Sequence, residues 1–256
     1  MLYHQHSRRN RGQVPVTPQT MCFTVAQYHK VAQARMRYWN ARSNAPEAEQ
    51  RFVASAFERP SLSVVRIDRH EPIIELARWG LVPAWCRTED EAQRVALSTL
   101  NARGETIFDK PSFREAAAHS RCILPVNGFF EYQHVGKQRV PYFISMEGEP
   151  IFSVGGLLSE WESSSTGLLL RTFSVVTTEA NPLMATIHNS KKRMPLILSR
   201  ENERLWLEGS PTEASALVRP SVSPHLQAWR VSPFVVRGRV VNQPSSIQPM
   251  NEGLLF

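Results

Sequence analysis

The chain has 256 residues, of which 42% are hydrophobic, and this length allows one sizeable core. Its net charge is +7, of which Arg8, Arg9 and Arg11 supply three units, so the +4 on residues 21–256 permits nucleic-acid binding without requiring it. Three cysteines without CxxC spacing argue against a disulfide framework or a zinc cage and favour a reducing, cytoplasmic setting.

The first twenty residues are polar and basic and show no hydrophobic period. We therefore expect residues 1–20 to be a disordered leader before a single domain over 21–256. No apolar run has the length of a secretion signal or a membrane span, so we expect no contact with a membrane. The sequence has no internal repeat and no glycine-rich phosphate loop, and we expect no cofactor and no metal.

Apolar spacing and acidic first turns predict helices in the first part of the domain, and β-branched stretches predict strands. The predicted helices cover residues 25–39 and 46–57, and the predicted strands cover 61–67 and 73–82. Thr88 and Glu91 have the spacing of a capping box, and Ser112 and Glu115 repeat it, so a short helix is expected at each place.

A buried central strand is expected over the apolar run 121–132. The elements expected after it are strands at 140–146, 151–158 and 168–177, a short helix at 178–188, a cationic loop and a returning strand within 189–198, helices at 201–207 and 211–218, a last strand at 228–236 and an irregular tail from 242. Runs of strands broken by isolated helices predict an α+β fold, with a mainly antiparallel sheet or barrel-like β core and peripheral helices.

Glu131 is a single carboxylate between aromatic neighbours in the predicted central strand. A carboxylate is seldom buried in such a place without a partner or a task. We interpret Glu131 as the acid/base residue of an active site. The alternative is one half of a buried salt bridge with an arginine.

Five short motifs follow one another in the chain. They are Met21-Cys22, WGLVPAW at 79–85, NARGE at 101–105, GFFEY at 128–132, and His188 followed by RMP at 193–195. Each motif alone is a weak signal, but in this order they resemble the SRAP family, the SOS response-associated peptidase domain, over nearly all of residues 21–256.

The resemblance implies a covalent chemistry on single-stranded DNA. Family members cross-link to abasic sites, whose ring-opened sugar exposes an aldehyde, through an N-terminal cysteine that is uncovered when the initiator methionine is removed. Here that residue is Cys22. An α-amine titrates at about pH 8, so a fraction of it is unprotonated at neutral pH and can form a Schiff base. The thiol then closes a thiazolidine ring at high effective concentration.

The resemblance also implies roles for the surrounding residues. A carboxylate near an imidazole can shuttle the protons of these steps. The expected catalytic residues are Cys22, Asn101, Glu131 and His188, and the expected DNA-binding residues are Arg103, Trp79, Trp85, Phe129, Arg193, Lys191 and Lys192. Capping of the following turn is an equal alternative for Asn101 and Arg103, and a position in the core is the alternative for the tryptophans.

The chain departs from the family pattern in three places. Cys22 stands behind 21 residues, so a free α-amine requires that translation starts at Met21 or that the leader is removed. We expect a start at Met21. Phe23-Thr24 replaces the family's Gly-Arg, which removes one arginine expected to contact phosphate. The segment from His188 to Arg193 is longer than the compact His-x-Arg-Met-Pro pattern.

Three functions remain open from the sequence. The first is a monomeric protein that binds single-stranded DNA and forms a reversible thiazolidine cross-link at abasic sites, which shields the lesion. The second is a cysteine peptidase that removes its own leader, with Cys22 as nucleophile, Glu131 as orienting group and His188 as acid/base. The third is a non-catalytic binder of modified or single-stranded DNA.

Overall fold

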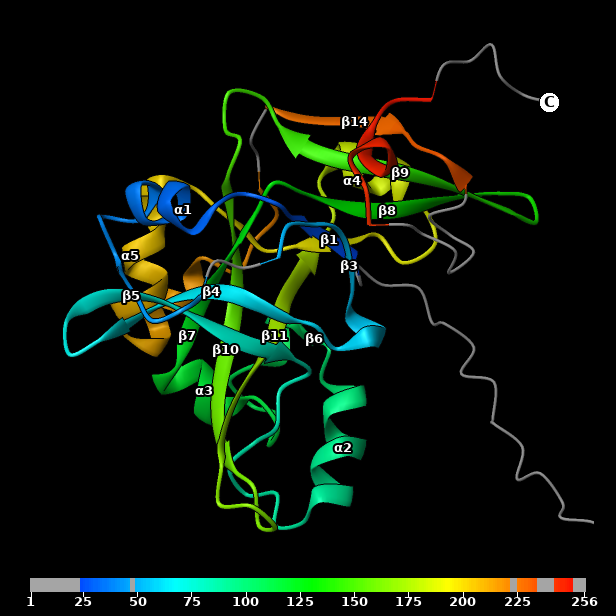
Figure 1. The fold of residues 1–256 in the computed structure, drawn as a ribbon. Helices are drawn as coiled ribbons and strands as arrows, with labels where there is room; N and C mark the ends of the chain where they lie inside the picture. The colour runs from blue at the N-terminus through cyan, green and yellow to red at the C-terminus, as the bar shows by residue number, and fades with distance from the viewer. Residues whose placement is uncertain (1–23, 47–48, 222–224, 234–241, 251–256) are drawn as a thin grey trace, which may run out of the picture.

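The computed structural model describes residues 24–46, 49–221, 225–233 and 242–250 (Figure 1). The leader predicted at 1–20, Cys22 and Phe23 lie outside the described residues, as do the last three positions of the strand predicted at 228–236. None of the helices in the described ranges combines the length and apolarity needed to cross a membrane.

The smaller of two sheets has five strands in the order β14-β9-β8-β1-β3, and all of its neighbouring strands are antiparallel. Its strands are β1 (Thr24–Gln27), β3 (Arg51–Ser55), β8 (Gly128–Val135), β9 (Gln138–Met146) and β14 (Leu226–Arg230).

The larger sheet closes on itself. Its central strands are β4 (Ser61–Asp68), β5 (Glu71–Trp79), β7 (Arg121–Val126), β10 (Phe152–Glu162) and β11 (Leu169–Glu179). They pair in the order β11-β10-β7-β4-β5, and β5 pairs back to β11 in parallel, which completes a five-stranded barrel. Because the barrel is closed, each of these five strands has a paired neighbour on both sides.

Short strands extend the barrel and carry part of the candidate site. They are β2 (Arg42–Ser43) on β5, β6 (Asn101–Arg103) and β12 (Arg193–Pro195) on β11, and β13 (Ile197–Leu198) on β10. Since β6 and β12 both pair with the carboxyl end of β11, the NARGE and RMP motifs lie together in space.

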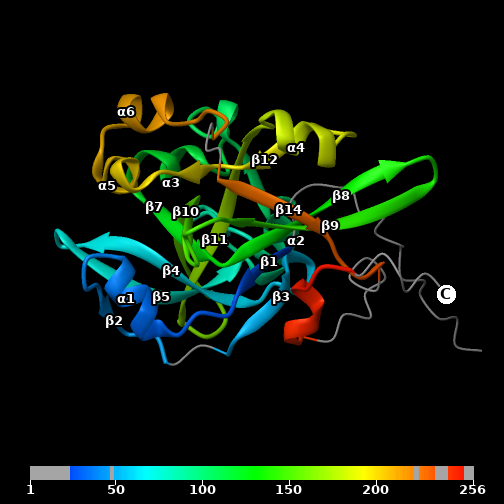
Figure 2. The same cartoon turned by 90° about the horizontal axis from the view of Figure 1, so that it is seen from above.

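The helices are short and peripheral (Figure 2). They are α1 (Val31–Arg37), α2 (Glu89–Ser98), α3 (Arg114–His119), α4 (Pro182–Ile187), α5 (Arg200–Glu208) and α6 (Pro211–Ala216), with 3-10 turns η1 (Ala56–Glu58), η2 (Gly104–Thr106) and η4 (Pro244–Ile247). The predicted α+β class with a mainly antiparallel, barrel-like core is confirmed.

The expected central strand over 121–132 is two strands, β7 in the barrel and β8 in the smaller sheet. Asn127 makes the crossing: its Oδ1 accepts from the Tyr28 and His29 amides at 2.8 and 3.1 Å. The next residue, Gly128, has to be glycine because a Cβ there would lie 2.1 Å from Phe143 Cζ. The chain therefore changes sheets just before Glu131.

Two predicted helices are wrong in whole or in part. Residues 24–27 form β1, so the helix expected at 25–39 is reduced to α1, and the helix expected at 46–57 is replaced by β3 and η1. Pairing of β1 with β3, with Tyr28 stacked on Phe52 at 4.8 Å, overrides the weak helical pattern. Thr88 caps α2 as predicted, accepting from the Glu91 amide at 3.2 Å, whereas α3 begins after Phe113 without a side-chain cap.

A buried ion pair attaches α5 to the barrel. Glu203, 1% exposed, accepts from Arg37 at 2.6 and 3.1 Å and from the Ser153 hydroxyl at 2.6 Å. Glu203→Ala should lower the free energy of unfolding by up to about 3–5 kcal/mol in urea denaturation, because it leaves the buried guanidinium with Glu149, at 3.6 Å, as its remaining carboxylate partner among the described residues. The control Glu208→Ala breaks an exposed pair with Arg204 on the same helix and should cost about 0.3–0.5 kcal/mol. Equal losses would contradict the assignment.

Candidate active site

Glu131 and His188 meet between the smaller sheet and the end of α4. Glu131 lies on β8 and is 1% exposed, and His188 caps the carboxyl end of α4 and is 0% exposed. His188 Nδ1 is 3.2 Å from Glu131 Oε2. The helix that delivers His188 starts at Asn181, whose side chain accepts from the Met184 amide at 2.9 Å.

The backbone fixes the tautomer of His188. Its Nδ1 is also 2.9 Å from the carbonyl oxygen of Arg193, and a carbonyl can only accept a hydrogen bond, so Nδ1 carries the proton. The buried Nε2 has no hydrogen-bond partner among the residues that the structure describes. An imidazole held in this way turns Nε2 to one side and rests against a carboxylate on the other.

The second half of the site lies on the barrel around β11. Arg103 on β6 is opposite Thr177 of β11, and the Arg193 guanidinium donates to the Thr177 carbonyl at 2.7 Å. Arg193 also binds Glu105 with two hydrogen bonds of 2.6 and 2.9 Å. Partial burial acts to raise the pKa of Glu105, but the bonds from Arg193 hold that pKa below its ordinary value. Arg193 thus joins the barrel side to His188 through its own carbonyl.

One hydrophobic cluster supports both halves of the site. Leu100, Ile187 and Met194 are the chain neighbours of Asn101, His188 and Arg193, and all three are buried in the cluster that also holds Val25 and Phe129. Packing of these apolar residues brings together motifs that are up to about ninety residues apart in the sequence. The predicted residues Asn101, Glu131, His188 and Arg193 therefore adjoin one core.

Two rings expected to contact DNA are in the core instead. Trp79 and Phe129 are both 0% exposed. Trp79 stacks on Phe173 at 5.4 Å and donates its indole hydrogen to the Leu100 carbonyl at 2.7 Å. Their assignment to base stacking is corrected, because the closed barrel needs large side chains to fill it. Gly80 follows with φ of +100°, a conformation that favours glycine.

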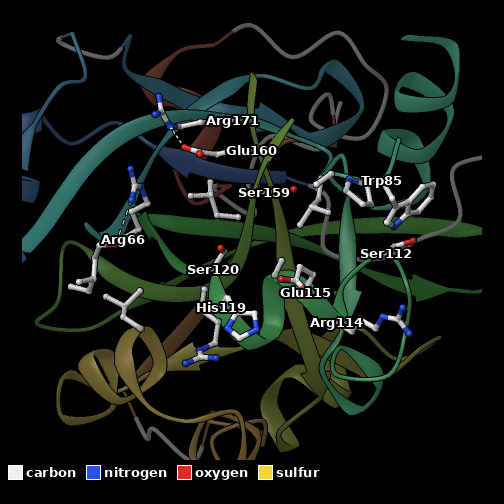
Figure 3. Close-up of a pocket in the computed structure, with 18 of the residues that line it drawn as sticks. Arg66, Trp85, Ser112, Arg114, Glu115, His119, Ser120, Ser159, Glu160 and Arg171 are labelled. Atoms are coloured by element: carbon white, nitrogen blue, oxygen red, sulfur yellow. Dashed lines mark hydrogen bonds and ion pairs between the residues drawn. The ribbon is translucent and has the colours of Figure 1, made fainter. Parts of the chain in front are cut away.

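Trp85 is 47% exposed and remains a candidate stacking surface, with its indole donating to the Pro111 carbonyl at 3.2 Å. It borders a cavity of about 770 Å³ (Figure 3). Figure 3 shows Trp85 and Arg114 on one side of the cavity and Arg66 and Arg171 on the other. Arg66 is paired with Asp68, and Arg171 is paired with Glu160.

The charges of this cavity are largely neutralised. Arg66 pairs with Asp68 and Glu75, and Arg171 pairs with Glu75 and Glu160. Asn101, Glu131 and His188 are not among the described residues that line it. We therefore place the candidate active site at the Glu131–His188 pair and regard the cavity as a separate feature.

The remaining predicted cations are exposed around the site. Arg103, Lys191 and Lys192 all reach solvent, and the Lys192 amide donates to the His188 carbonyl at 2.8 Å, which closes the cationic loop. Within the described ranges, no group of three or more His, Cys, Asp or Glu side chains is arranged to hold a metal ion.

Sequence reasoning missed several residues beside the site. The sequence identifies Glu105 as part of the NARGE motif, and the structure shows that it is the ion-pair partner of Arg193. Tyr132 was also overlooked. Burial raises the pKa of Tyr132 to about 12, and its side chain hydrogen-bonds that of Thr24, which holds the start of β1 beside β8.

Comparison with known proteins identifies the family of the chain. Residues 21–237 match the family described as SOS response associated peptidase (SRAP). The abasic site processing protein YoqW of Bacillus subtilis is 34% identical over 176 residues, covering 67% of this chain and 72% of that protein. The abasic site processing protein HMCES of Gallus gallus is 30% identical over 177 residues, covering 60% of this chain and 52% of that protein.

A crystal structure of a Bacteroides thetaiotaomicron protein has the same fold. It superposes with a TM-score of 0.84 at 33% sequence identity, and the match covers 90% of this chain and 100% of that one. A Bordetella bronchiseptica protein at 24% identity superposes with a TM-score of 0.72, which extends the likeness of fold.

Proposed function

Because the chain belongs to the SOS response-associated peptidase family, we propose that it recognises abasic sites in single-stranded DNA and cross-links to them through Cys22. The relatives YoqW and HMCES are named abasic site processing proteins, and we assign that activity to this chain. The protein acts as a monomer in the cytoplasm under this proposal.

The observation that carries the proposal is the buried Glu131–His188 pair, in which the imidazole Nε2 has no hydrogen-bond partner among the described residues. Such a nitrogen needs a group to exchange protons with. Thr24 pairs with Phe130, the neighbour of Glu131, and Cys22 is two residues before Thr24. β1 therefore begins beside the strand that carries Glu131, which supports the assignment of Cys22 to this site.

The reaction follows from the groups available. The α-amine of Cys22 adds to the aldehyde carbon of the opened sugar, and the resulting hydroxyl leaves as water when it receives a proton. The thiol of Cys22 then adds to the same carbon and closes the thiazolidine, so that one water is released in total. His188 Nε2 passes the proton lost by the amine to the former aldehyde oxygen, which becomes the hydroxyl, and then passes the thiol proton to that hydroxyl as it leaves as water, while Glu131 stabilises the imidazolium that forms in each transfer.

The DNA-binding part of the proposal uses the cations around this pair. We assign the phosphates of a single strand to three exposed cations, Arg103, Lys191 and Lys192. Arg193 contacts a phosphate as well, where the phosphate replaces Glu105 as its partner or binds the guanidinium together with Glu105. Trp85 is assigned to an unpaired base. Asn101 is assigned to the sugar that reacts.

The free amine requires a chain that begins at Cys22. The match to the family begins at residue 21, which supports translation from Met21 followed by removal of the methionine. A second candidate, a peptidase that cleaves before Cys22, uses the same Glu131–His188 pair. The intact mass of a chain expressed from Met1 distinguishes the two routes, because self-cleavage alone releases the leader in purified protein and is lost in His188→Ala.

The cross-link is tested with an oligonucleotide that carries one abasic site. Protein expressed from Met21 should give a band of lower mobility on denaturing electrophoresis, with a mass equal to protein plus oligonucleotide minus one water. An oligonucleotide with a tetrahydrofuran in place of the abasic sugar has no aldehyde and should give no such band. Absence of the band with both oligonucleotides, or its presence with both, contradicts the proposed function.

A further inference from the structure

The loop after His188, which is longer than the family pattern, makes a specific contact with β8. The Asn189 carboxamide accepts from the His134 amide at 3.0 Å and donates to the His134 carbonyl at 2.9 Å. Both main-chain groups of His134 therefore bind one side chain. Among the described residues, β1 pairs with β8 only as far as Phe130, so Asn189 occupies the edge of β8 that β1 leaves.

A second bridge lies on the other side of His188. Gln133 Nε2 donates to the Thr186 carbonyl at 3.1 Å. The two bridges thus run from the residues of β8 just beyond Glu131 to positions two before and one after His188. They connect the two short elements that carry the catalytic pair.

We propose that Asn189 is a positioning residue that holds the His188 imidazole against Glu131. α4 has only six residues, and its carboxyl end carries His188 into the site. Met184 and Arg193 contact His188 from its own side of the site, whereas Asn189 and Gln133 fix that side to the strand of Glu131. The 3.2 Å contact depends on both attachments.

We expect the contact of Asn189 with His134, called the clamp below, to affect the rate of cross-linking and not the free energy of unfolding. Asn189 is exposed, and exposed hydrogen bonds contribute little to the free energy of unfolding. A displacement of about 1 Å between catalytic groups, by contrast, can slow a reaction about 100-fold. As a positioning role at the cross-linking site, the inference rests on the proposed function.

The test compares Asn189→Ala with Ser190→Ala, a neighbouring exposed residue whose side chain makes no hydrogen bond within the described residues. At saturating abasic oligonucleotide, the single-turnover cross-linking rate should fall about 10- to 100-fold in Asn189→Ala and stay within about twofold in Ser190→Ala. The Kd for the tetrahydrofuran oligonucleotide should be unchanged in both. Equal rates in the two variants, or a parallel loss of affinity, overturn the proposal.

A second readout does not depend on cross-linking. The Nδ1 proton of His188, held between Arg193 and Glu131, should give a downfield proton NMR signal that is present in Ser190→Ala and is shifted or broadened in Asn189→Ala. If the downfield signal changes in Asn189→Ala and not in Ser190→Ala, but the wild-type protein forms no cross-link, the positioning role of Asn189 stands and the proposed function fails. If the wild type cross-links and Asn189→Ala matches it in rate and spectrum, the function stands and the clamp fails.

Discussion

Cys22→Ala should abolish the covalent adduct with an abasic oligonucleotide while the variant still binds the tetrahydrofuran oligonucleotide. The substitution keeps the α-amine but removes the thiol, so the Schiff base that forms cannot close to a thiazolidine and is hydrolysed. Denaturing electrophoresis after incubation measures the effect directly, and at least a 100-fold lower yield of stable adduct is expected, of the order supplied by ring closure at high effective concentration.

Cys86→Ala is the matched control for this variant. Cys86 is buried, and burial raises the pKa of its thiol to about 11, which keeps it protonated and unreactive at neutral pH. The control should cross-link at the wild-type rate. An adduct that persists in Cys22→Ala and disappears in Cys86→Ala would move the nucleophile to the other residue.

Glu131→Gln should slow cross-linking by about 100- to 10,000-fold, the range that a positioned acid/base group supplies. The amide keeps the shape of the side chain at 3.2 Å from His188 but removes the negative charge that stabilises the imidazolium. Single-turnover rates at saturating oligonucleotide measure this loss. The Kd for uncleaved single-stranded DNA should change little.

Glu162→Gln, at the exposed end of β10, provides the control for the loss of a carboxylate and should leave the rate unchanged. If Glu131→Gln weakens DNA binding as much as it slows the reaction, Glu131 has a structural role. Unfolding of the variant, followed by circular dichroism, separates that outcome from a catalytic effect.

The Glu131–His188 contact illustrates what could be predicted from the sequence. Both residues were identified from motifs 57 positions apart, and the structure places their side chains 3.2 Å apart. The α+β class followed from the spacing of strands and isolated helices. The residue pattern alone singled out Glu131, as a carboxylate within an apolar run, whereas His188 was assigned through the resemblance to the family.

The failures have a common physical cause. β3 was predicted as a helix because its sequence was read alone, whereas its structure depends on pairing with β1. Trp79 and Phe129 were assigned to DNA because aromatic residues serve both cores and binding surfaces, and periodicity could not show that the barrel closes over Trp79. The Asn189 contact with His134 joins residues 55 positions apart and leaves no local pattern.

The proton on His188 Nδ1 faces a main-chain oxygen, that of residue 193, as well as the carboxylate of Glu131. A change of side chain at this residue leaves its carbonyl in place as long as β12 keeps its pairing with β11. Under the proposed function, substitutions at 193 can therefore change the contact with a DNA phosphate without disturbing the imidazole, so that affinity for the lesion and the rate of cross-linking can vary separately at one position.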